Sequence, residues 1–451
     1  MTNSRTSTSS TDVKINEVTI HPSTGKPQDI SQIVNVINIH EDLFLPVITG
    51  SVQLIDGRSL PGAFSLHGNE FITISFNRPD DQGSDTKYIK SFRIYKIAER
   101  GQAGTSQTQS YIIYFCSEEL VYSNQLLISK TYKDGNCTDY VKKILMKDLK
   151  TNSKRILDQN FELSSGDSYH VITRYKPFEA INYFANHSFN NNYSTFVFFE
   201  NKDGFNFSSL EQLFKRPTLN ELSYNTSKFT NEIQNAVFKN SNDVNKFEIA
   251  QTFDILKNTR KGAYSSTHLT LDILTQQYKR NKYSVVDEKN KKIMMDGNFP
   301  FNDAKNRGGK ALYEEYDSCV KYSITNLGQT NNPYFQSKVQ RVLDTNIENT
   351  LVQRNMQLSL LQSTALECIV PGNPFYSVGY MLDFNMPAFS QNPDSERLID
   401  PYYKGKYLIT ETRHMISGGK LQTMLRLSKN SVATAYDKAS ESDNFSRARR
   451  Y

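Results

Sequence analysis

The side chains that most often carry chemistry are dispersed along this sequence. The seven histidines are His21, His40, His67, His170, His187, His268 and His414. No two of them have the spacing of a helical metal pair such as HExxH. We therefore interpret each histidine as a surface or structural residue and expect no metal site.

Two adjacent pairs of carboxylates are the nearest approach to an acid–base centre. They are Glu118 with Glu119 and Glu314 with Glu315. Glycoside cleavage needs two carboxyl groups at a set separation across a cleft, so the sequence favours solvated faces instead. No GxSxG, GxxxxGK[ST] or GxGxxG motif supports a hydrolase, an NTPase or a dinucleotide enzyme. We expect no catalytic residue and no cofactor.

A basic stretch with interleaved aromatic residues runs from Lys279 to Lys292 and includes Tyr278 and Tyr283. A single-strand nucleic-acid binder uses this combination, but a solvated loop is the preferred interpretation. The formal charge of +6 arises from 53 basic and 47 acidic residues mixed along the chain. So small an excess does not argue for nucleic-acid binding.

The cysteines and the hydrophobic segments indicate the cellular setting. The four cysteines, Cys116, Cys137, Cys319 and Cys368, show no CxxC pairing, which favours reduced, mostly buried thiols. Residues 1–12 lack the apolar region of a signal peptide, and no apolar run reaches 18 residues. We expect a soluble protein synthesised in a cytoplasm.

At 451 residues the chain is long enough for two to four domains, each of which would position some of these residues. Period-two alternation predicts strands at 13–20, 32–39, 45–57 and 69–76, and a hairpin over 88–120. A helical turn is expected near 58–64. Residues 13–120 are therefore predicted to form a small closed antiparallel barrel.

Helical spacing appears after this first segment. Helices are predicted at 137–149 and 176–189, the latter with Pro177 in its first turn. A hairpin is expected around 201–204, a helix or strand within 245–262, an inserted domain within 216–333, and a helix from Pro333. Short strands at 365–372, 380–387, 405–416 and 420–428 then predict a second antiparallel β-domain. Both polar ends are expected to be flexible.

Three segments carry a set of residues that belong together. The first segment carries Gly50, Asp56, Leu60, Gly68 and Glu70. The second has a helix introduced by Pro177, a turn at Gly204, and the run Phe253 to Tyr264. The third segment carries Gly372, Gly379, Gly405, Tyr407, Leu408, Ile409, Thr410, His414, Gly418 and Gly419. In this order the segments resemble the central hub proteins of contractile-tail (T-even-like) bacteriophage baseplates, which are related to the hub part of secretion-system spike proteins.

The resemblance implies a mainly β fold with α+β insertions: two tail-tube-like antiparallel barrels plus inserted α/β domains. The first barrel would span 13–120, and the second 241–271 with 335–435. An α+β domain would occupy 121–240, and an insertion at 272–334 would pack with it. Residues 1–12 and 436–451 would be flexible ends. His414 would be a hydrogen-bonded strand residue at a barrel rim rather than a ligand or proton donor.

The function implied is structural and non-enzymatic. Three chains would form a homotrimeric, pseudo-sixfold ring that adapts a sixfold tail tube to a threefold central spike and forms part of the DNA ejection channel. Expected partners are the spike or tail-lysozyme protein, tail tube proteins and baseplate wedge proteins, with a tape measure protein as a further possible partner. DNA would pass through the ring without sequence-specific binding. The expected location is the virion tail baseplate.

Three alternatives stay open at this point. The chain could be the hub of a phage-like injection or secretion machine, which would share the ring. A cell-wall polysaccharide hydrolase with β-domains would need a carboxylate-lined cleft. A nucleic-acid binder would need tight phosphate contacts, which a channel for rapid DNA transit should avoid.

Overall fold

The computed structural model describes most of the chain. The described ranges are 11–23, 25–58, 60–63, 66–78, 87–104, 108–133, 135–165, 170–190, 193–224, 244–272, 276–287, 293–305, 309–316, 319–325, 347–386 and 399–436. The predicted flexible ends fall almost wholly outside these residues, as does the first part of the helix predicted from Pro333.

The first part of the chain is built from strands that alternate between buried and half-exposed positions. These strands are β1 (Lys14–His21), β2 (Gln28–Asp29), β3 (Val34–Asp42), β4 (Thr49–Asp56), β5 (Phe71–Asn77), β6 (Tyr88–Gln102) and β7 (Gln109–Cys116). The turn η1 (Ser31–Ile33) precedes β3, and α1 (Leu60–Ala63) follows β4. The predicted hairpin is confirmed, because β6 and β7 pair antiparallel.

The last part of the chain supplies a second group of strands. They are β12 (Thr218–Ser223), β13 (Lys246–Gln251), β17 (Thr364–Pro371), β18 (Met381–Asn385), β19 (Gly405–Ser417) and β20 (Lys420–Lys429). The segment 245–262, predicted as helix or strand, contains one of each, since α6 (Ile255–Lys261) follows β13. The four predicted C-terminal strands are confirmed as β17 to β20.

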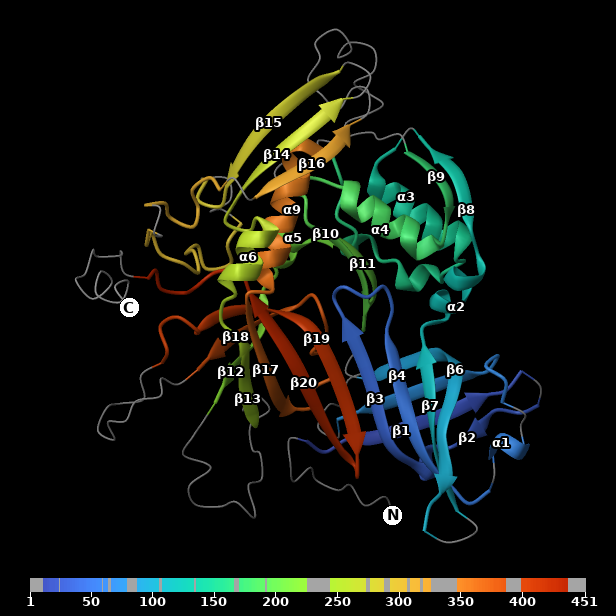
Figure 1. Cartoon of the computed structure of the whole chain (residues 1–451). Helices are drawn as coiled ribbons and strands as arrows, with labels where there is room; N and C mark the ends of the chain where they lie inside the picture. Colours follow the sequence, from blue (N-terminus) through green and yellow to red (C-terminus); the bar gives the residue numbers. More distant parts are fainter. Residues whose placement is uncertain are drawn as a thin grey trace, which may run out of the picture.

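Hydrogen bonds join both groups into one 13-stranded sheet. Its order is β13-β17-β20-β19-β3-β4-β7-β6-β5-β1-β2, with β18 paired to β19 and β12 paired to β18. The seam is the antiparallel pairing of β19 with β3, which Figure 1 shows near the middle of the molecule. The mainly antiparallel β fold is thus confirmed. Within the described residues, the strands expected in two separate barrels form one continuous sheet.

A compact α+β unit lies between the two groups of strands in the sequence. It contains two pairs of antiparallel strands: β8 (Ile128–Tyr132) with β9 (His170–Tyr175), which are far apart in the sequence, and the hairpin of β10 (Phe196–Asn201) with β11 (Gly204–Ser209). Its helical elements are α2 (Glu118–Gln125), α3 (Cys137–Lys143), η3 (Ile144–Asp148), η4 (Ser153–Arg155), η5 (Asp158–Asn160), α4 (Pro177–His187) and α5 (Leu210–Leu213). Pro177 occupies the first turn of α4, as predicted. The helix predicted at 137–149 ends in a π-helical turn, η3.

A separate three-stranded sheet has the order β15-β14-β16, with β14 (Ser265–Asp272), β15 (Gln277–Ser284) and β16 (Val320–Thr325). It lies beside α9 (Ile347–Leu361) at the top of Figure 1. The strand β14 ends the range 241–271 that was predicted to belong to the second barrel, and here it pairs with the insertion strands. The domain boundaries themselves stay a prediction. Across the described residues, no helix is long and apolar enough to span a membrane.

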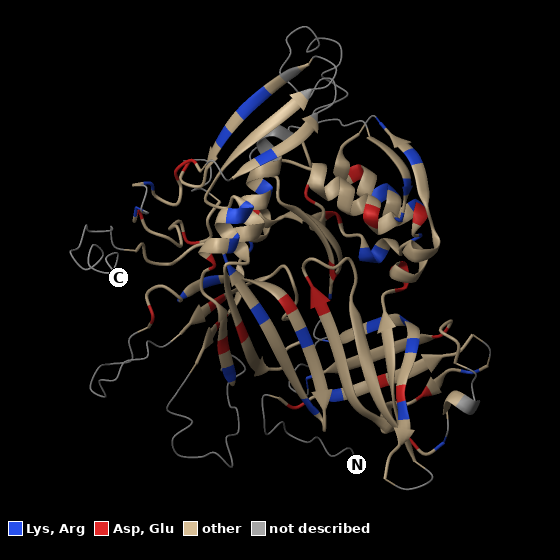
Figure 2. Ribbon diagram, viewed as in Figure 1, with Lys and Arg blue, Asp and Glu red and all other residues tan. Residues whose placement is uncertain are grey.

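In the part of the chain that is described, apolar side chains gather into four cores. One core fills the first group of strands and also takes in Ile416 and Leu421 from the C-terminal hairpin. A second lies among β10, β12 and β17 to β20, and a third lies between α3, α4 and the paired strands of the α+β unit. The fourth joins α9 to the start of β14 and the end of β15. Charged residues of both signs are interleaved over the ribbon, as Figure 2 shows.

Candidate functional site

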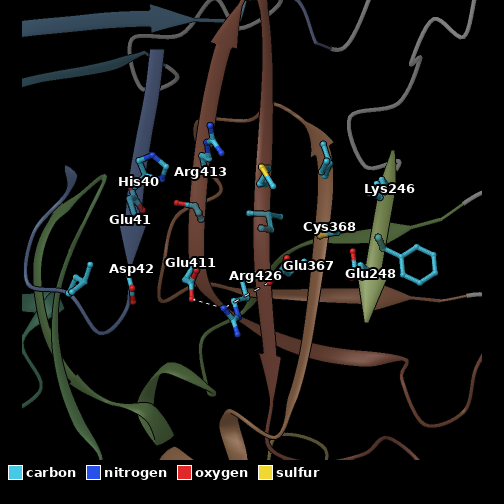
Figure 3. Close-up of a pocket in the computed structure, with 16 residues that line it drawn as sticks. His40, Glu41, Asp42, Lys246, Glu248, Glu367, Cys368, Glu411, Arg413 and Arg426 are labelled. Atoms are coloured by element: carbon cyan, nitrogen blue, oxygen red, sulfur yellow. Dashed lines mark hydrogen bonds and ion pairs between the residues drawn. The ribbon is translucent and has the colours of Figure 1, made fainter. Parts of the chain in front are cut away.

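A groove crosses the open face of the sheet at the seam. It has a volume of about 410 Å³ and is lined from five neighbouring strands, β3, β19, β20, β17 and β13 (Figure 3). Alternation sets this face, because successive side chains of a strand point to opposite sides. In β19, Glu411 and Arg413 are half-buried and face the groove, whereas Thr412 and His414 are buried.

The register of the five strands aligns charged residues directly opposite one another. Asp42 pairs with Glu411, Glu411 with Arg426, Arg426 with Glu367, and Glu367 with Glu248. We name these five residues the acidic row, and Figure 3 shows them in a line across the strands. Four carboxylates therefore share a single guanidinium.

A second row lies two residues away along each strand. Its members are His40, Arg413, Met424, Ile369 and Lys246, and the same strand pairings place them opposite one another. We name it the cationic row. The groove thus presents a stripe of negative charge beside a stripe of mixed positive and apolar character.

The acidic row is only partly neutralised. The Nη1 atom of Arg426 lies 3.2 Å from Oε1 of Glu411 and 4.0 Å from Oε1 of Glu367. Within the described residues no ion pair reaches Asp42 or Glu248. Burial raises the pKa of both Asp42 and Glu411. For Glu411, the neighbouring carboxylates also raise it. Like charges directly opposite on neighbouring strands are destabilising, so the row favours a cationic contact from outside.

Replacing Arg426 with Gln should expose this repulsion. We expect Arg426→Gln to lower the free energy of unfolding by about 1 kcal/mol at low salt. The acidic row would then hold four half-exposed carboxylates that repel one another and no positive charge. High salt should remove most of the difference. Urea denaturation at 20 mM and 500 mM NaCl measures it, with Lys406→Gln, an exposed lysine of the same sheet, as the matched control. A deficit that is equal at both salt concentrations would contradict the argument.

A buried polar network lies beneath the seam and is centred on Glu200 of β10. Its Oε1 atom is 2.8 Å from Lys90 Nζ of β6 and 2.6 Å from Arg155 Nη2 of η4. Its Oε2 atom accepts hydrogen bonds from Ile48 N at 3.0 Å and from Ser117 Oγ. Burial alone would raise the pKa of Glu200, but Lys90 and Arg155 lower it to about 2. One carboxylate therefore ties the α+β unit to the first group of strands.

Glu41 of β3 makes the corresponding link to the last part of the chain. Its Oε2 atom accepts hydrogen bonds from Ser377 Oγ and, at 3.1 Å, from Val378 N. The side chain is fully buried, and burial raises its pKa to about 7. Its other oxygen, Oε1, has no hydrogen-bond partner among the described residues. Glu41 and Glu200 thus have opposite preferences for the proton.

The residues considered from the sequence take structural positions. Glu119 is buried and pairs with Arg155 at 2.6 Å, while Glu118 accepts a hydrogen bond from Tyr122. His414 is buried in β19, with Nδ1 2.9 Å from Thr423 Oγ1. All four cysteines are free and buried, as predicted. In the part of the chain that is described, no group of three or more His, Cys, Asp or Glu side chains could hold a metal ion.

The part of the basic stretch up to Ser284 belongs to β15, not to the loop that the sequence favoured, and residues 288–292 lie outside the described residues. Tyr278 is exposed and Tyr283 is half-buried, and because they are five residues apart in one strand their rings lie on opposite faces. Arg280 and Lys282 both pair with Glu315. The strand pairing therefore separates the aromatic residues and neutralises part of the positive charge.

Neither charged row was predicted from the sequence. A local signal was present, since Glu411 and Arg413 have the two-residue spacing of a single strand face. The rows also require the pairing of β3 with β19, which no local pattern shows. The buried network was missed for the same reason, because Lys90, Arg155 and Glu200 come from distant segments.

The whole-chain architecture can be compared with known proteins. No protein-family model matches the chain, and no curated protein matches its sequence. A tail protein from Neisseria meningitidis matches in structure with a TM-score of 0.52 and 11% identity, over 93% of this chain and 99% of its own. The 43 kDa tail protein of prophage MuSo2 from Shewanella oneidensis matches with a TM-score of 0.50 and 8% identity, over 92% and 98%.

The chain has the fold of phage tail proteins. At lower similarity, with a TM-score of 0.41, a component of the type VI secretion system of E. coli matches 95% of this chain and 79% of its own. The matches to the two tail proteins cover more than nine-tenths of this chain and nearly all of each of theirs. The groove and its charged rows lie at the seam of this fold.

Proposed function

We propose that this chain is the structural hub of a contractile phage tail baseplate, located in the virion after synthesis in the host cytoplasm. The observation that carries the proposal is the match of more than nine-tenths of the chain to two tail proteins, one of them from a prophage. The hub would be a homotrimer whose two halves, one on each side of the β3–β19 seam, give the ring pseudo-sixfold symmetry. Such a ring meets a sixfold tube on one side and a threefold spike on the other.

The large sheet suits a part that transmits load. Its hydrogen bonds are continuous across the seam, Glu41 links β3 to the loop at Ser377, and Glu200 ties the α+β unit to the first group of strands. Buried, hydrogen-bonded networks of this kind rigidify the elements that they join. A rigid subunit with an open, charged sheet face fits a role of binding neighbours rather than substrates.

The partners in this proposal are the spike or tail-lysozyme protein, tube proteins, wedge proteins and a tape measure protein. DNA would pass through the ring without sequence-specific contacts. The acidic row disfavours tight binding of phosphate wherever it faces the DNA path. No enzymatic activity is part of the proposal.

The first test is the symmetry of the purified chain. We expect electron-microscope class averages at high protein concentration to show threefold rings with a central channel, and native mass spectrometry to give three copies. Compact monomers that also stay monomeric with the spike protein would contradict the hub assignment. Turnover of peptidoglycan by the purified chain would favour the hydrolase alternative instead.

The segment 437–451, which lies outside the described residues, is proposed to tether the spike. Its last residues, SRARRY, can pair with acidic groups of a partner. We expect a chain that ends at residue 436 to form the same ring and to bind the spike protein more weakly, as measured by co-sedimentation. Unchanged spike binding would refute the tether, while leaving the ring proposal intact.

A further inference from the structure

The acidic row at the seam carries more negative charge than the described part of the sheet neutralises. It consists of two carboxylate pairs, Asp42 with Glu411 and Glu367 with Glu248, on either side of Arg426 (Figure 3). The two members of each pair lie directly opposite each other on neighbouring strands, where like charges repel. The Nη1 atom of Arg426 lies 3.2 Å from Oε1 of Glu411 and 4.0 Å from Oε1 of Glu367. The two pairs therefore share one guanidinium.

The neighbouring cationic row does not supply the missing charge. The Nε and Nη2 atoms of Arg413 donate to Oδ1 of Asn38 at 3.1 and 2.9 Å. In β3, Asn38 and Asp42 lie on opposite sides of His40, the residue that pairs with Arg413, so the guanidinium points away from the acidic row. Burial, followed by the charge of Arg413, lowers the pKa of His40, so this ring is neutral at pH 7.

The groove above the row is accessible to a segment of polypeptide. It has a volume of about 410 Å³, and the side chains of Glu367 and Glu411 are 49% and 47% exposed. Half-exposed carboxylates can be paired from outside without the full desolvation cost of a buried ion pair. Met424 and Ile369, in the row beside them, offer apolar contacts. The groove therefore suits a segment that combines cations with apolar side chains.

The end of the sequence has this chemistry. Its last eight residues, NFSRARRY, carry Arg447, Arg449 and Arg450, two aromatic residues and no acidic side chain. They lie outside the described residues. A guanidinium presents its donors in a planar fork that matches a carboxylate in a bidentate contact. Three such cations complement two carboxylate pairs that share one arginine.

The tail is also long enough to reach the groove of its own chain. Tyr436, the last described residue, is ten residues beyond Arg426 of the acidic row. Since an extended chain spans at most about 3.3–3.6 Å per residue, Tyr436 lies no more than about 36 Å from Arg426. The eleven residues from Tyr436 to Arg447 span at least about as much when extended. The chain length therefore permits Arg447 to return to the row.

We propose that the C-terminal tail docks in the groove of the same chain, with its arginines paired to the carboxylates of the acidic row and its aromatic rings against Met424 and Ile369. The docking does not depend on the hub function. A tail that also tethers the spike has to leave the groove first, so the groove holds the tether back until the spike binds. That regulatory role rests on the proposed function.

The test is the binding of a fluorescently labelled peptide, NFSRARRY, to full-length chains in 50 mM NaCl, measured by fluorescence anisotropy. The variant Arg447→Gln/Arg449→Gln/Arg450→Gln has a neutral tail and an open groove, and we expect it to bind one peptide per chain. Wild type should bind the peptide at least about fivefold more weakly, because its own tail competes at a high effective concentration. Circular dichroism confirms that each variant is folded.

The groove is tested in the neutral-tail variant. Adding Glu367→Gln/Glu411→Gln should weaken peptide binding about fivefold or more, because two carboxylates that pair with the arginines are lost. Binding should also weaken at 500 mM NaCl. The control Glu17→Gln/Asp287→Asn removes two exposed carboxylates elsewhere and should stay within about twofold.

Three results would overturn the proposal. Equal binding of the peptide by wild type and by the neutral-tail variant would leave the groove to a cationic segment of another protein. A wild-type difference that disappears at tenfold lower protein concentration would assign the tail to a second copy of the chain. Equal weakening by the control pair, or no binding to the neutral-tail variant, would exclude the groove. None of these measurements involves a spike or a ring, so they stand whether or not the hub function does.

Discussion

Glu200→Gln is expected to destabilise the protein by about 3–5 kcal/mol at pH 7. The substitution removes a fully buried carboxylate charge, which leaves Lys90 without its ion pair and Arg155 with Glu119 alone, and removing one member of a buried ion pair has this magnitude. The Gln side chain can still accept from Ile48 N and Ser117 Oγ, so the change tests charge rather than shape. Urea denaturation followed by far-UV circular dichroism measures the free energy of unfolding.

The pH dependence of the free energy of unfolding provides a second test of this prediction. The folded-state pKa of Glu200, about 2, lies below the ordinary value of 4.5, so its charge stabilises the fold above pH 4.5 and that stabilisation is lost as the pH falls toward 2. The difference between wild type and Glu200→Gln should therefore be largest at neutral pH and shrink in acid. Glu17→Gln, at an exposed position of β1, is the control and should change stability by less than about 0.5 kcal/mol.

Glu41→Gln is expected to act in the opposite direction. Burial raises the folded-state pKa of Glu41 from 4.5 to about 7, so the folded state binds a proton that the unfolded state releases between these values. The resulting loss of stability is absent below pH 4.5 and complete above pH 7, where it amounts to at most about 3 kcal/mol. A neutral amide avoids it while its oxygen accepts from Ser377 and Val378.

The measurement compares wild type with Glu41→Gln at pH 4.5 and pH 8. We expect the variant to be the more stable protein at pH 8, and to lose that advantage or become less stable at pH 4.5. A difference that does not vary with pH would show that Glu41 is ionised in the folded state throughout. Glu17→Gln again provides the comparison, because an exposed carboxylate should give no such slope.

Local patterns were sufficient for most of the elements. Alternation in LITETRHMI predicted β19, and a helix-compatible stretch opened by Pro177 predicted α4, because both signals depend on neighbours within a few residues. Two glycines in the resembling segments have a physical reason. A Cβ at Gly50 would lie 2.4 Å from Asn38 O, and Gly204 has φ +131° with a Cβ position 2.5 Å from Arg155 O.

The pairing of strands that lie far apart in the sequence could not be predicted. Alternation predicts a half-buried strand both within residues 34–42 and within residues 405–417. Nothing local indicates that these two strands pair with each other and join two groups of strands into one sheet. The buried Glu200 was equally hidden, because it sits in the apolar run FVFFEN and charged residues are rarely buried unless paired. Its partners, Lys90 and Arg155, are recognisable only once the fold brings them together.

The seam also constrains how this protein can be made. Ile416 and Leu421 belong to the same core as the first seven strands, and β19 covers the edge of β3. A growing chain therefore carries a nearly finished N-terminal half whose core stays open, and whose strand edge stays unpaired, until almost the whole sequence has left the ribosome. Such an edge is prone to pair with other chains. Truncation or slow synthesis before residue 405 should therefore produce aggregates rather than a smaller folded protein.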